Sequence, residues 1–413
     1  MDFDDSPEEA AFRAEARAFL EAHAERKRGE GDWSRGFYTN TDEAGRAAFY
    51  DRCQAWQATL YDEGWAGITW PQEHGGRGGT AMQQAIFNQE QAQFDVATGM
   101  FAVGIGMAGP TLMAHGTAAQ KERYLGPMLR GDEVWCQLFS EPGAGSDLAA
   151  LATRAVRDGD EWVVDGQKVW TSGAHFSRFG ILLARTDPDA PKHRGITYFL
   201  VDMRSPGIEV RPLRQATGAS HFNEVFLSGV RVPHDQVVGE VHGGWRVAVT
   251  TLANERTSIA GGTTAQTFDE LLRLARALDR AGDPVVRQGL ADVYIRGRLL
   301  TFLGYRLQTA LSQGRQPGPE ASVMKLLYSR QWSSAGDLAV TLEGAHGMLA
   351  GPDAPVDGFW QQYHMNQYSV RIGGGTDEVQ HNVIAERVLG LPLEPRVDKD
   401  VPWRELAARS AIA

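Results

Sequence analysis

Apolar side chains recur at helical spacing from residue 5 to about residue 130. The first helix carries an N-terminal signature, because Ser6 precedes Pro7 and Glu9 follows at the third helical position. Its apolar face then consists of Phe12, Ala16, Phe19 and Leu20. Further helices are predicted near residues 43–63, 80–96 and 117–130, and the glycine-rich stretch 70–79 is predicted to be a loop.

The pattern changes at about residue 133, where short segments rich in β-branched and aromatic residues alternate with Asp-Gly, Pro-Gly and Ser-Gly turns. This spacing predicts an antiparallel sandwich or barrel of roughly 100 residues. The strands are expected at residues 134–139, 153–157, 162–167, 180–185, 197–202, 208–212 and 223–227.

Helical spacing returns after the glycine pair at residues 243–244. Long helical segments are predicted at residues 245–280, 284–313, 320–343 and 376–389. The predicted fold is therefore α+β, with helices, then strands, then helices. Its expected parts are an N-terminal α-helical domain (1–132), a middle antiparallel β-sandwich or barrel domain (133–238), a C-terminal four-helix-bundle-like domain (239–395) and a tail (396–413).

The charge balance is acidic, with 41 Lys and Arg against 52 Asp and Glu and a formal net charge of −11. This balance argues against nucleic acid or an anionic membrane as a partner of the general surface. Any anionic ligand must therefore be bound by local groups.

The two cysteines, Cys53 and Cys136, lie far apart and lack C-x-x-C spacing, so neither a disulfide framework nor a metal site is predicted. The N-terminus is acidic and lacks the apolar segment of a secretory signal, so a cytoplasmic location is expected. Residues 96–113 contain no charged side chain, but glycines and Pro110 interrupt them. A buried helix and turn is therefore predicted there, and no membrane span.

Residues 371–378 combine successive glycines with a threonine that can cap a helix. The glycines at 373–375 allow positive φ values and close approach of the backbone, and Thr376 then opens a helix. Asp377 and Glu378 place negative charge where a phosphate would bind the helix N-terminus, so a neutral carbonyl or a flavin edge suits this loop better than an anion. The alternative is a flexible turn before a capped helix.

A second glycine-rich stretch, residues 140–147, follows the apolar segment that ends at Phe139. Its backbone amides, with the Ser146 hydroxyl, could hold phosphate oxygens without a lysine. Residues 168–173 then pair the flat indole of Trp170 with two hydroxyls, a combination that suits stacking on a planar cofactor. A tight turn and a core tryptophan are the ordinary alternatives.

Residues 104–109 match G-x-G-x-x-G, but no convincing strand precedes them and Pro110 follows directly. A dinucleotide site is therefore not predicted at this position. No Walker A sequence, H-E-x-x-H sequence or Ser/His/Asp signature is present either.

Four stretches in this order, residues 141–147, 167–173, 375–380 and 385–390, resemble the acyl-CoA dehydrogenase family. The resemblance covers nearly the whole chain, and the order of helices, strands and helices agrees with it. It implies FAD bound in each subunit, an acyl-CoA thioester as substrate and an electron-transfer flavoprotein as electron acceptor. It also implies a homotetramer arranged as a dimer of dimers, with a heteromer as the alternative.

Carried over by position, the resemblance implies cofactor contacts along both glycine-rich stretches. They are Gln137, Phe139 and Ser140 beside the flavin ring, Gly145 and Ser146 at the pyrophosphate, Trp170 and Ser172 against the isoalloxazine, and Thr376 and Glu378 near the end of the chain.

Two elements of the family pattern are weakened. The Arg-x-x-Phe-Gly element, whose arginine reaches the FAD of a neighbouring subunit, is not recognisable before Leu290. Arg273, Arg276 and Arg280 remain open as its replacement. A later glycine-rich element survives only as residues 343–347.

The chemistry that the resemblance implies needs a carboxylate to remove the proton α to the thioester carbonyl. In the commonest branch of the family this base stands directly before Gly-Thr, but here the position holds Gly374. A minority branch takes its base from a helix that resembles residues 252–262, with Glu255 at the base position. Glu255 is therefore predicted to be the base, and the backbone N–H of Gly374 is predicted to donate to the thioester oxygen. The alternative is a surface pair between Glu255 and Arg256.

The leading hypothesis is thus an FAD-dependent oxidoreductase that converts an acyl-CoA to the trans-2-enoyl-CoA. An oxygen-using flavin oxidase or monooxygenase on the same scaffold is the second hypothesis. A partner subunit with an impaired FAD site is the third. The small residues between 99 and 109 and the triple glycine hint at a pocket for branched, aromatic or steroid-like acyl groups.

Overall fold

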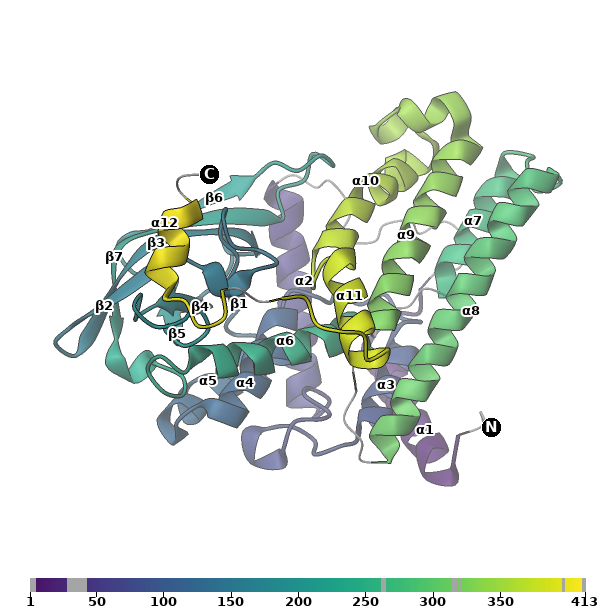
Figure 1. Ribbon diagram of the computed structural model, residues 1–413. Coiled ribbons are helices and arrows are strands. Elements are labelled where there is room, and N and C mark those ends of the chain that lie inside the picture. Colours follow the sequence, from purple (N-terminus) through teal and green to yellow (C-terminus); the bar gives the residue numbers. More distant parts are fainter. Residues whose placement is uncertain are drawn as a thin grey trace. The chain divides into compact units, whose positions relative to one another are not determined.

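The computed structural model describes residues 5–27, 43–260, 265–313, 318, 321–395 and 398–410 (Figure 1). The chain divides into two compact units, each assembled from separate stretches of sequence. The helical unit consists of the described parts of residues 1–44, 79–96 and 256–393. The sheet unit consists of the described parts of residues 45–78, 97–255 and 394–413.

A seven-stranded sheet forms the centre of the sheet unit and curls on itself (Figure 1). Its strands are β1 (Trp135–Leu138), β2 (Arg154–Asp158), β3 (Glu161–Ser172), β4 (Phe179–Arg185), β5 (Ile196–Asp202), β6 (Ile208–Leu213) and β7 (Phe222–Pro233). The strand order is β1-β4-β2-β3-β7-β6, and β5 pairs with β4. Each predicted strand segment is observed, so the prediction of a middle β region is confirmed.

The pairing within this sheet is mixed. The β2–β3, β3–β7, β4–β5 and β6–β7 pairs are antiparallel, as predicted, whereas β4 runs parallel to β1 and, through one residue pair, to β2. Sequence alternation reports which side chains are buried and not which strand lies alongside, so the parallel pairs gave no signal. Inward-facing Val164, Leu182, Phe199 and Val225 are buried together in the core of this sheet.

Helices and short turns surround the sheet within the same unit. They are α2 (Glu43–Asp62, apart from its first two residues), α4 (Gly109–His115), α5 (Ala118–Arg130), α6 (Gly244–Ala260, up to Glu255) and α12 (Trp403–Ser410), a π-helical turn at Gly104–Ala108, and 3₁₀ turns at Gln72–His74, Leu148–Ala150 and His234–Gln236. The predicted capping of α5 is confirmed, since the Thr117 hydroxyl accepts from the Gln120 N–H at 3.2 Å.

The G-x-G-x-x-G match at 104–109 has a packing explanation. It forms the π-helical turn and the start of α4, and a Cβ on Gly109 would lie 2.2 Å from the Trp70 ring. The glycine therefore makes room for a buried indole. The predicted buried helix is confirmed here, and within the described ranges no helix is long and apolar enough to cross a membrane.

The helical unit consists of α1 (Pro7–His23), α3 (Ala81–Gln91), α7 (Ala265–Ala277), α8 (Pro284–Ser312), α9 (Ala321–Glu343), α10 (Phe359–Ile372) and α11 (Asp377–Val383), with a π-helical turn at Ile384–Val388 and 3₁₀ turns at Gly344–Met348, Gly351–Asp353 and Pro355–Gly358. Helix α9 packs against α7, α8, α10 and α11. Trp332 on α9 and Tyr363 on α10 stack with ring centroids 4.3 Å apart in the core.

Two details differ from the sequence expectation. The segment predicted at 245–280 is two helices, α6 and α7. Helix α10 was not predicted, because polar residues such as Gln361 and Gln367 stand at buried positions where the helical pattern calls for apolar ones.

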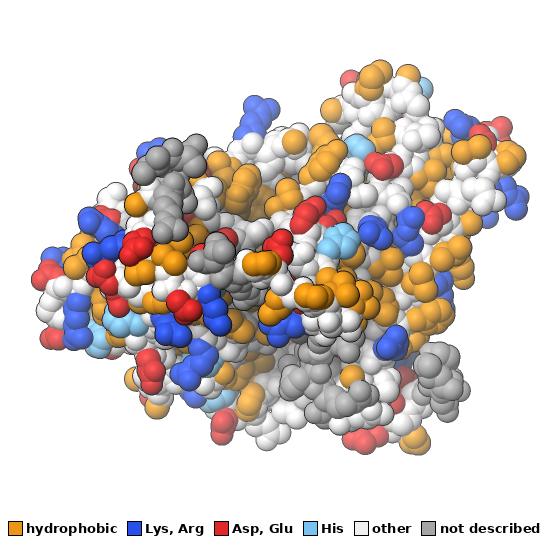
Figure 2. Space-filling model, in the orientation of Figure 1, with side chains coloured by type: hydrophobic (Ala, Val, Ile, Leu, Met, Phe, Trp, Pro, Cys, Tyr) orange, Lys and Arg blue, Asp and Glu red, His pale blue; other side chains and the backbone are white. Residues whose placement is uncertain are grey.

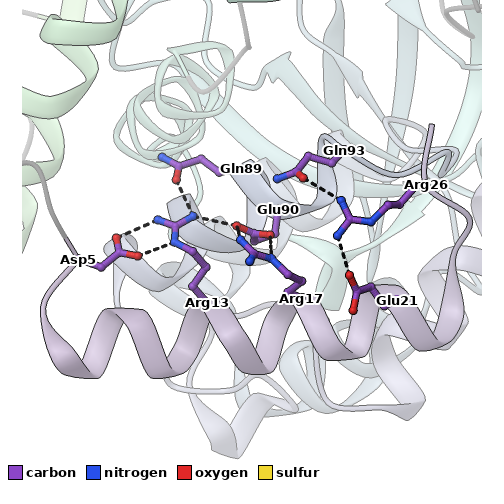
Figure 3. A network of polar contacts seen from close by, with 8 residues as sticks. All are labelled: Asp5, Arg13, Arg17, Glu21, Arg26, Gln89, Glu90 and Gln93. Atoms are coloured by element: carbon purple, nitrogen blue, oxygen red, sulfur yellow. Dashed lines mark hydrogen bonds and ion pairs between the residues drawn. The ribbon is translucent and has the colours of Figure 1, made fainter. Parts of the chain in front are cut away.

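A polar network joins α1 to α3 in the helical unit (Figure 3). Glu90 on α3 is only 2% exposed and accepts from Arg17 Nε at 2.9 Å and from Arg13 Nη1 at 3.1 Å. Arg13 also binds Asp5 in front of the helix and Gln89 on α3 (Figure 3). The N-terminal helix is therefore held by charged groups as well as by its apolar face.

Candidate functional site

The two stretches predicted to contact the flavin lie side by side in the sheet unit. The first leaves the sheet at the end of β1, and the second is the last part of β3. The Val169 N–H donates to the Ser140 carbonyl at 2.9 Å and joins them. Phe139 is buried, with its ring edge-on to Tyr198 at 5.9 Å between centroids, whereas Gln137 and Ser140 are half-buried.

A buried ion pair fixes this junction from inside. Lys168 is fully buried and donates from Nζ to Glu141 Oε1 at 2.7 Å and to the Phe139 carbonyl at 3.0 Å. The Glu141 carboxylate also accepts from the backbone N–H groups of Ala152 and Thr153, at 2.6 and 2.9 Å. A single lysine thus ties β3 to the strand end that carries Phe139.

Burial and ion pairing shift the pKa values of Glu141 and Lys168 in opposite directions. Burial by itself would raise the pKa of Glu141, but the Lys168 ammonium and the hydrogen bonds to the carboxylate outweigh it and hold that pKa below its ordinary value. Burial lowers the pKa of Lys168, while the Glu141 carboxylate acts in the opposite direction. The carboxylate therefore stays ionised beside its partner.

The Trp170 side chain points toward solvent. The β3–β7 pairing is irregular between Lys168 and Thr171, Trp170 takes a positive φ of 61°, and its side chain is 60% exposed. The alternative of a core tryptophan is therefore wrong. Ser172 beside it is exposed, and the buried Thr171 hydroxyl finds no partner among the described residues. An exposed indole on a strand suits a planar ligand.

The glycine-rich loop that follows Ser140 is open and held at its base. Glu141 and Ala144 exchange two backbone hydrogen bonds of 2.9 and 3.0 Å around a tight turn. Beyond it Gly145 and Ser146 are exposed, and a Cβ on Gly145 would meet nothing within 4 Å. Uncrowded backbone and a free-standing hydroxyl fit a phosphate ligand.

The second glycine loop, in the helical unit, has the backbone that its sequence predicts. Gly374 and Gly375 take positive φ values of 65° and 85°. The Thr376 hydroxyl caps α11 by accepting from the Val379 N–H at 3.2 Å, and Gln380 Nε2 donates to the carbonyls of both glycines. The predicted cap is confirmed, and so are positive φ values at Gly374 and Gly375, whereas Gly373 is extended with a φ of −67°.

Asp377 anchors this loop through contacts that the sequence pattern did not predict. It is 7% exposed and accepts from Ser329 Oγ at 2.7 Å and from Lys325 Nζ at 3.1 Å, both on α9. Burial alone would raise the pKa of Asp377, but these hydrogen bonds and the lysine charge lower it. Asp377 is therefore a structural anion, and its charge is already balanced at the helix N-terminus.

Glu378 is exposed beside Asp377, and hydrogen bonds from its own N–H and from the Thr376 hydroxyl lower its pKa.

Arg280, one of the arginines considered for the missing family element, lies 3.2 Å from Asp283. The remnant at 343–347 contains buried Glu343, which accepts from Gln361 at 2.7 Å. Burial raises the pKa of Glu343 to about 7.

Glu255 is half-buried on α6. One helical turn before Glu255, two threonine hydroxyls connect α6 to α4. Thr250 Oγ1 lies 2.8 Å from His115 Nε2, and Thr251 Oγ1 lies 2.9 Å from Thr111 Oγ1. The side chain of Arg256, the alternative partner of Glu255, lies outside the described residues.

The structure thus brings most of the predicted residues together in two places. The first place is the junction of β1 and β3 in the sheet unit, with Gln137, Phe139, Ser140, Gly145, Ser146, Trp170 and Ser172. The same unit contains Glu255. The second place is the start of α11 in the helical unit, with Gly374, Thr376 and Glu378. The missed residues are the ions behind these loops, Lys168, Glu141 and Asp377. Their signal is a charge inside a stretch that is otherwise apolar or glycine-rich.

The side-chain chemistry available for a metal is limited. Within the described ranges no group of three or more His, Cys, Asp or Glu side chains is placed to hold a metal ion. Both cysteines are buried, and burial raises the pKa of Cys53 to about 11.

Acidic and basic side chains are interspersed over the face of the molecule that Figure 2 shows.

Comparisons with known proteins agree with this arrangement. Three family models match: the N-terminal, middle and C-terminal domains of acyl-CoA dehydrogenase, at residues 6–132, 136–230 and 242–389. The chain is 44% identical over 337 residues to acyl-CoA dehydrogenase FadE34 of Mycobacterium tuberculosis, covering 81% of this chain but only 46% of that protein, so it spans about half the length of that relative.

Two further similarities extend over most of both chains. Acyl-CoA dehydrogenase IpdE1 of Mycobacterium tuberculosis is 41% identical over 353 residues, which are 84% of this chain and 90% of that protein. A solved structure of the Tcur3481–Tcur3483 steroid ACAD superimposes with a TM-score of 0.80 at 32% identity, covering 95% of this chain and 100% of the other.

Proposed function

Because the chain belongs to the acyl-CoA dehydrogenase family, we propose that it oxidises an acyl-CoA thioester to the trans-2-enoyl thioester with FAD as its cofactor. The observation that carries this proposal is the junction of β1 and β3, where an exposed indole stands beside hydroxyl groups and an open glycine loop. FAD, when bound, supplies the acceptor for the hydride that leaves the β carbon.

The proposed cofactor contacts follow from the chemistry of each group. Trp170 offers a flat face for the isoalloxazine, and the hydroxyls of Ser140 and Ser172 offer hydrogen bonds to its polar edge. The backbone around Gly145 and the Ser146 hydroxyl would bind the pyrophosphate. The remaining proposed contacts are Gln137, Phe139, Thr376 and Glu378.

We propose that Glu255 is the base that removes the α proton of the substrate. The glycine loop holds no acid at position 374, whereas Glu255 lies on a helix that hydroxyl contacts of Thr250 and Thr251 hold one turn earlier. A carboxylate that becomes desolvated when substrate binds gains basicity, as a general base requires. The Gly374 N–H is proposed to donate to the thioester oxygen and so to stabilise the negative charge that develops there.

For the substrate, we propose a bulky acyl group that contains rings, of the steroid type. The similarity to a steroid ACAD at 32% identity over nearly the whole chain supports this choice. The small residues at 99–109 add no support, because the Trp70 ring fills the space at Gly109 and the Met128 side chain borders Gly104.

The decisive experiment compares the wild type with Glu255→Gln on a panel of acyl-CoAs, using a dye as electron acceptor. Loss of the base is expected to lower kcat on the best substrate about a hundredfold or more, while the visible flavin spectrum stays unchanged. The matched control is Glu122→Gln, an exposed glutamate on α5 of the same unit, which is expected to leave kcat unchanged. Near-normal turnover by Glu255→Gln would refute the assignment.

A second candidate is a subunit that acts only in a mixed assembly with another family member. The unrecognisable Arg-x-x-Phe-Gly element favours it, since a second chain could then supply the missing arginine, and the name of the Tcur3481–Tcur3483 steroid ACAD also joins two components. One flavin per chain in the protein purified alone would exclude an impaired FAD site.

A further inference from the structure

The C-terminal segment, residues 398–410, lies beyond residue 389, the last position that the family models match. It belongs to the sheet unit, where α12 lies beside the strands (Figure 1). None of the cofactor contacts proposed above involves this segment. Its contacts nonetheless converge on the loop that carries Gly145 and Ser146.

Trp403 is the apolar part of this contact. Its indole Nε1 donates to the Ala150 carbonyl at 3.1 Å, and its backbone N–H donates to the Ala190 carbonyl at 3.0 Å. The Arg185 guanidinium lies 5.0 Å from the ring centroid and donates from Nη2 to the Ala149 carbonyl at 2.6 Å. The indole and the guanidinium together hold the 3₁₀ turn that ends the glycine loop.

Lys192 is the charged part. Its Nζ lies 2.8 Å from Asp147 Oδ2, next to Ser146, and 2.6 Å from Asp398 Oδ2 in the C-terminal segment. The lysine side chain is only 12% exposed. Burial would lower the pKa of Lys192, but the two carboxylates outweigh burial and raise it, and the lysine in turn lowers the pKa of Asp398.

The glycine loop is thus held at both ends. Glu141 and Lys168 fix its start, and Asp147 and Ala150 are fixed by contacts that include the C-terminal segment. Binding an anion through backbone N–H groups requires those groups to converge before the ligand arrives, and a loop with exposed glycines would otherwise lose this order.

We propose that residues 398–410 are a positioning clamp for the phosphate-binding loop of FAD. The clamp touches neither substrate nor flavin in this proposal and acts through Ala150 and Asp147. The role as a cofactor clamp rests on the proposed function. The ordering of the loop by the clamp does not.

The experiment compares Trp403→Ala with Arg404→Ala, its neighbour on α12. Arg404 pairs with exposed Asp189 at 2.6 Å, and its side chain has no contact with the glycine loop in the described structure. Each flavin-stripped protein is titrated with FAD by flavin fluorescence, and backbone amide exchange of residues 143–150 is measured by mass spectrometry. Trp403→Ala is expected to raise the Kd for FAD about tenfold and to speed exchange in the loop, while Arg404→Ala changes neither by more than about twofold.

Asp398→Asn provides a milder variant in case Trp403→Ala does not fold. It keeps the segment in place but weakens the Lys192 bridge, so a smaller rise in Kd is expected, together with a weaker dependence of FAD binding on salt. Equal FAD affinity and equal loop exchange in wild type, Trp403→Ala and Asp398→Asn would overturn the clamp and leave the proposed function standing.

If the wild type itself binds no FAD, the proposed function fails and amide exchange decides the clamp alone. Faster exchange of residues 143–150 in Trp403→Ala would then support the ordering role. Unchanged exchange would overturn it.

Discussion

Lys168 and Glu141 show at the scale of single residues what the candidate site requires. Removing each charge from water costs several kcal/mol, and only their mutual contact and the surrounding hydrogen bonds offset that cost. Hydrophobic residues of similar size would fill the same space without this cost. The pair is therefore better explained by the geometry that it imposes, since it ties the Phe139 carbonyl to the strand that carries Trp170.

A double-mutant cycle on this pair tests that explanation. Lys168→Met leaves Glu141 buried without its cation and is expected to lower the free energy of unfolding by about 3–5 kcal/mol. Combining it with Glu141→Gln removes the unpaired charge and is expected to restore a large part of that loss.

Urea unfolding of the wild type, both single variants and the double variant measures this coupling. Arg211→Met with Glu209→Gln is the matched control, because that pair is more than half exposed on both sides and is expected to couple only weakly. A buried pair that coupled no more strongly than this exposed pair would contradict the explanation.

At the scale of elements, the helices and strands are joined by buried polar groups as well as by apolar contact. In the helical unit Asp377 anchors α11 to α9, and Glu90 anchors α3 to α1. These carboxylates are placed where two elements meet, and each is matched by cations from the neighbouring element. The packing between such elements therefore depends on pH.

Glu90 makes the folded protein less stable at low pH. Hydrogen bonds from Arg17, against the opposing effect of burial, lower the pKa of Glu90. A carboxylate with a lowered pKa in the folded state stabilises the protein above its unfolded pKa of about 4.3, and this stabilisation is lost as pH falls through the folded value. Glu90→Gln is therefore expected to cost about 2 kcal/mol at pH 7 and progressively less below about pH 4.

Urea midpoints of wild type and Glu90→Gln between pH 7 and pH 3 measure this difference. Glu21→Gln is the control on the same network, since Glu21 pairs with Arg26 where both side chains are about half exposed. It is expected to change stability by less than about 1 kcal/mol at any pH. A Glu90→Gln difference that stayed constant down to pH 3 would show that the carboxylate charge contributes nothing.

At the scale of the whole molecule, the electron acceptor distinguishes the proposed dehydrogenase from an oxygen-using flavoenzyme. The indole, hydroxyls and glycine loops that the sequence offers would serve a dehydrogenase and an oxygen-using flavoenzyme alike. We propose an electron-transfer flavoprotein as the electron acceptor of the dehydrogenase. An oxidase or monooxygenase would pass its electrons to oxygen.

Stopped-flow reoxidation separates these two activities. After reduction by acyl-CoA, the flavin is expected to be reoxidised slowly in air-saturated buffer and at least about a hundredfold faster by an electron-transfer flavoprotein or a dye that replaces it. The same flavin reduced by dithionite, without acyl-CoA, serves as the control for the effect of bound product. Rapid reoxidation in air after both reductions would favour the oxidase.

The sequence by itself determined the order of helices, strands and helices, every strand of the sheet and the cap at Thr376. These features depend on local rules: the period of apolar residues, the hydrogen-bonding reach of a threonine and the φ freedom of glycine. The family resemblance added the residues proposed to contact FAD. It did so because they stand in short contiguous motifs.

Only the tertiary structure decided which segments meet. The parallel β1–β4 pair, the buried Lys168–Glu141 contact and the return of Trp403 to Ala150 join residues that lie between 27 and 253 positions apart. No periodicity reports such a contact, because its free energy arises only when distant segments are packed together and their charges leave water. The exposure of Trp170 was decided in the same way, by an irregular pairing of β3 with β7 that turned a residue typical of a core toward solvent.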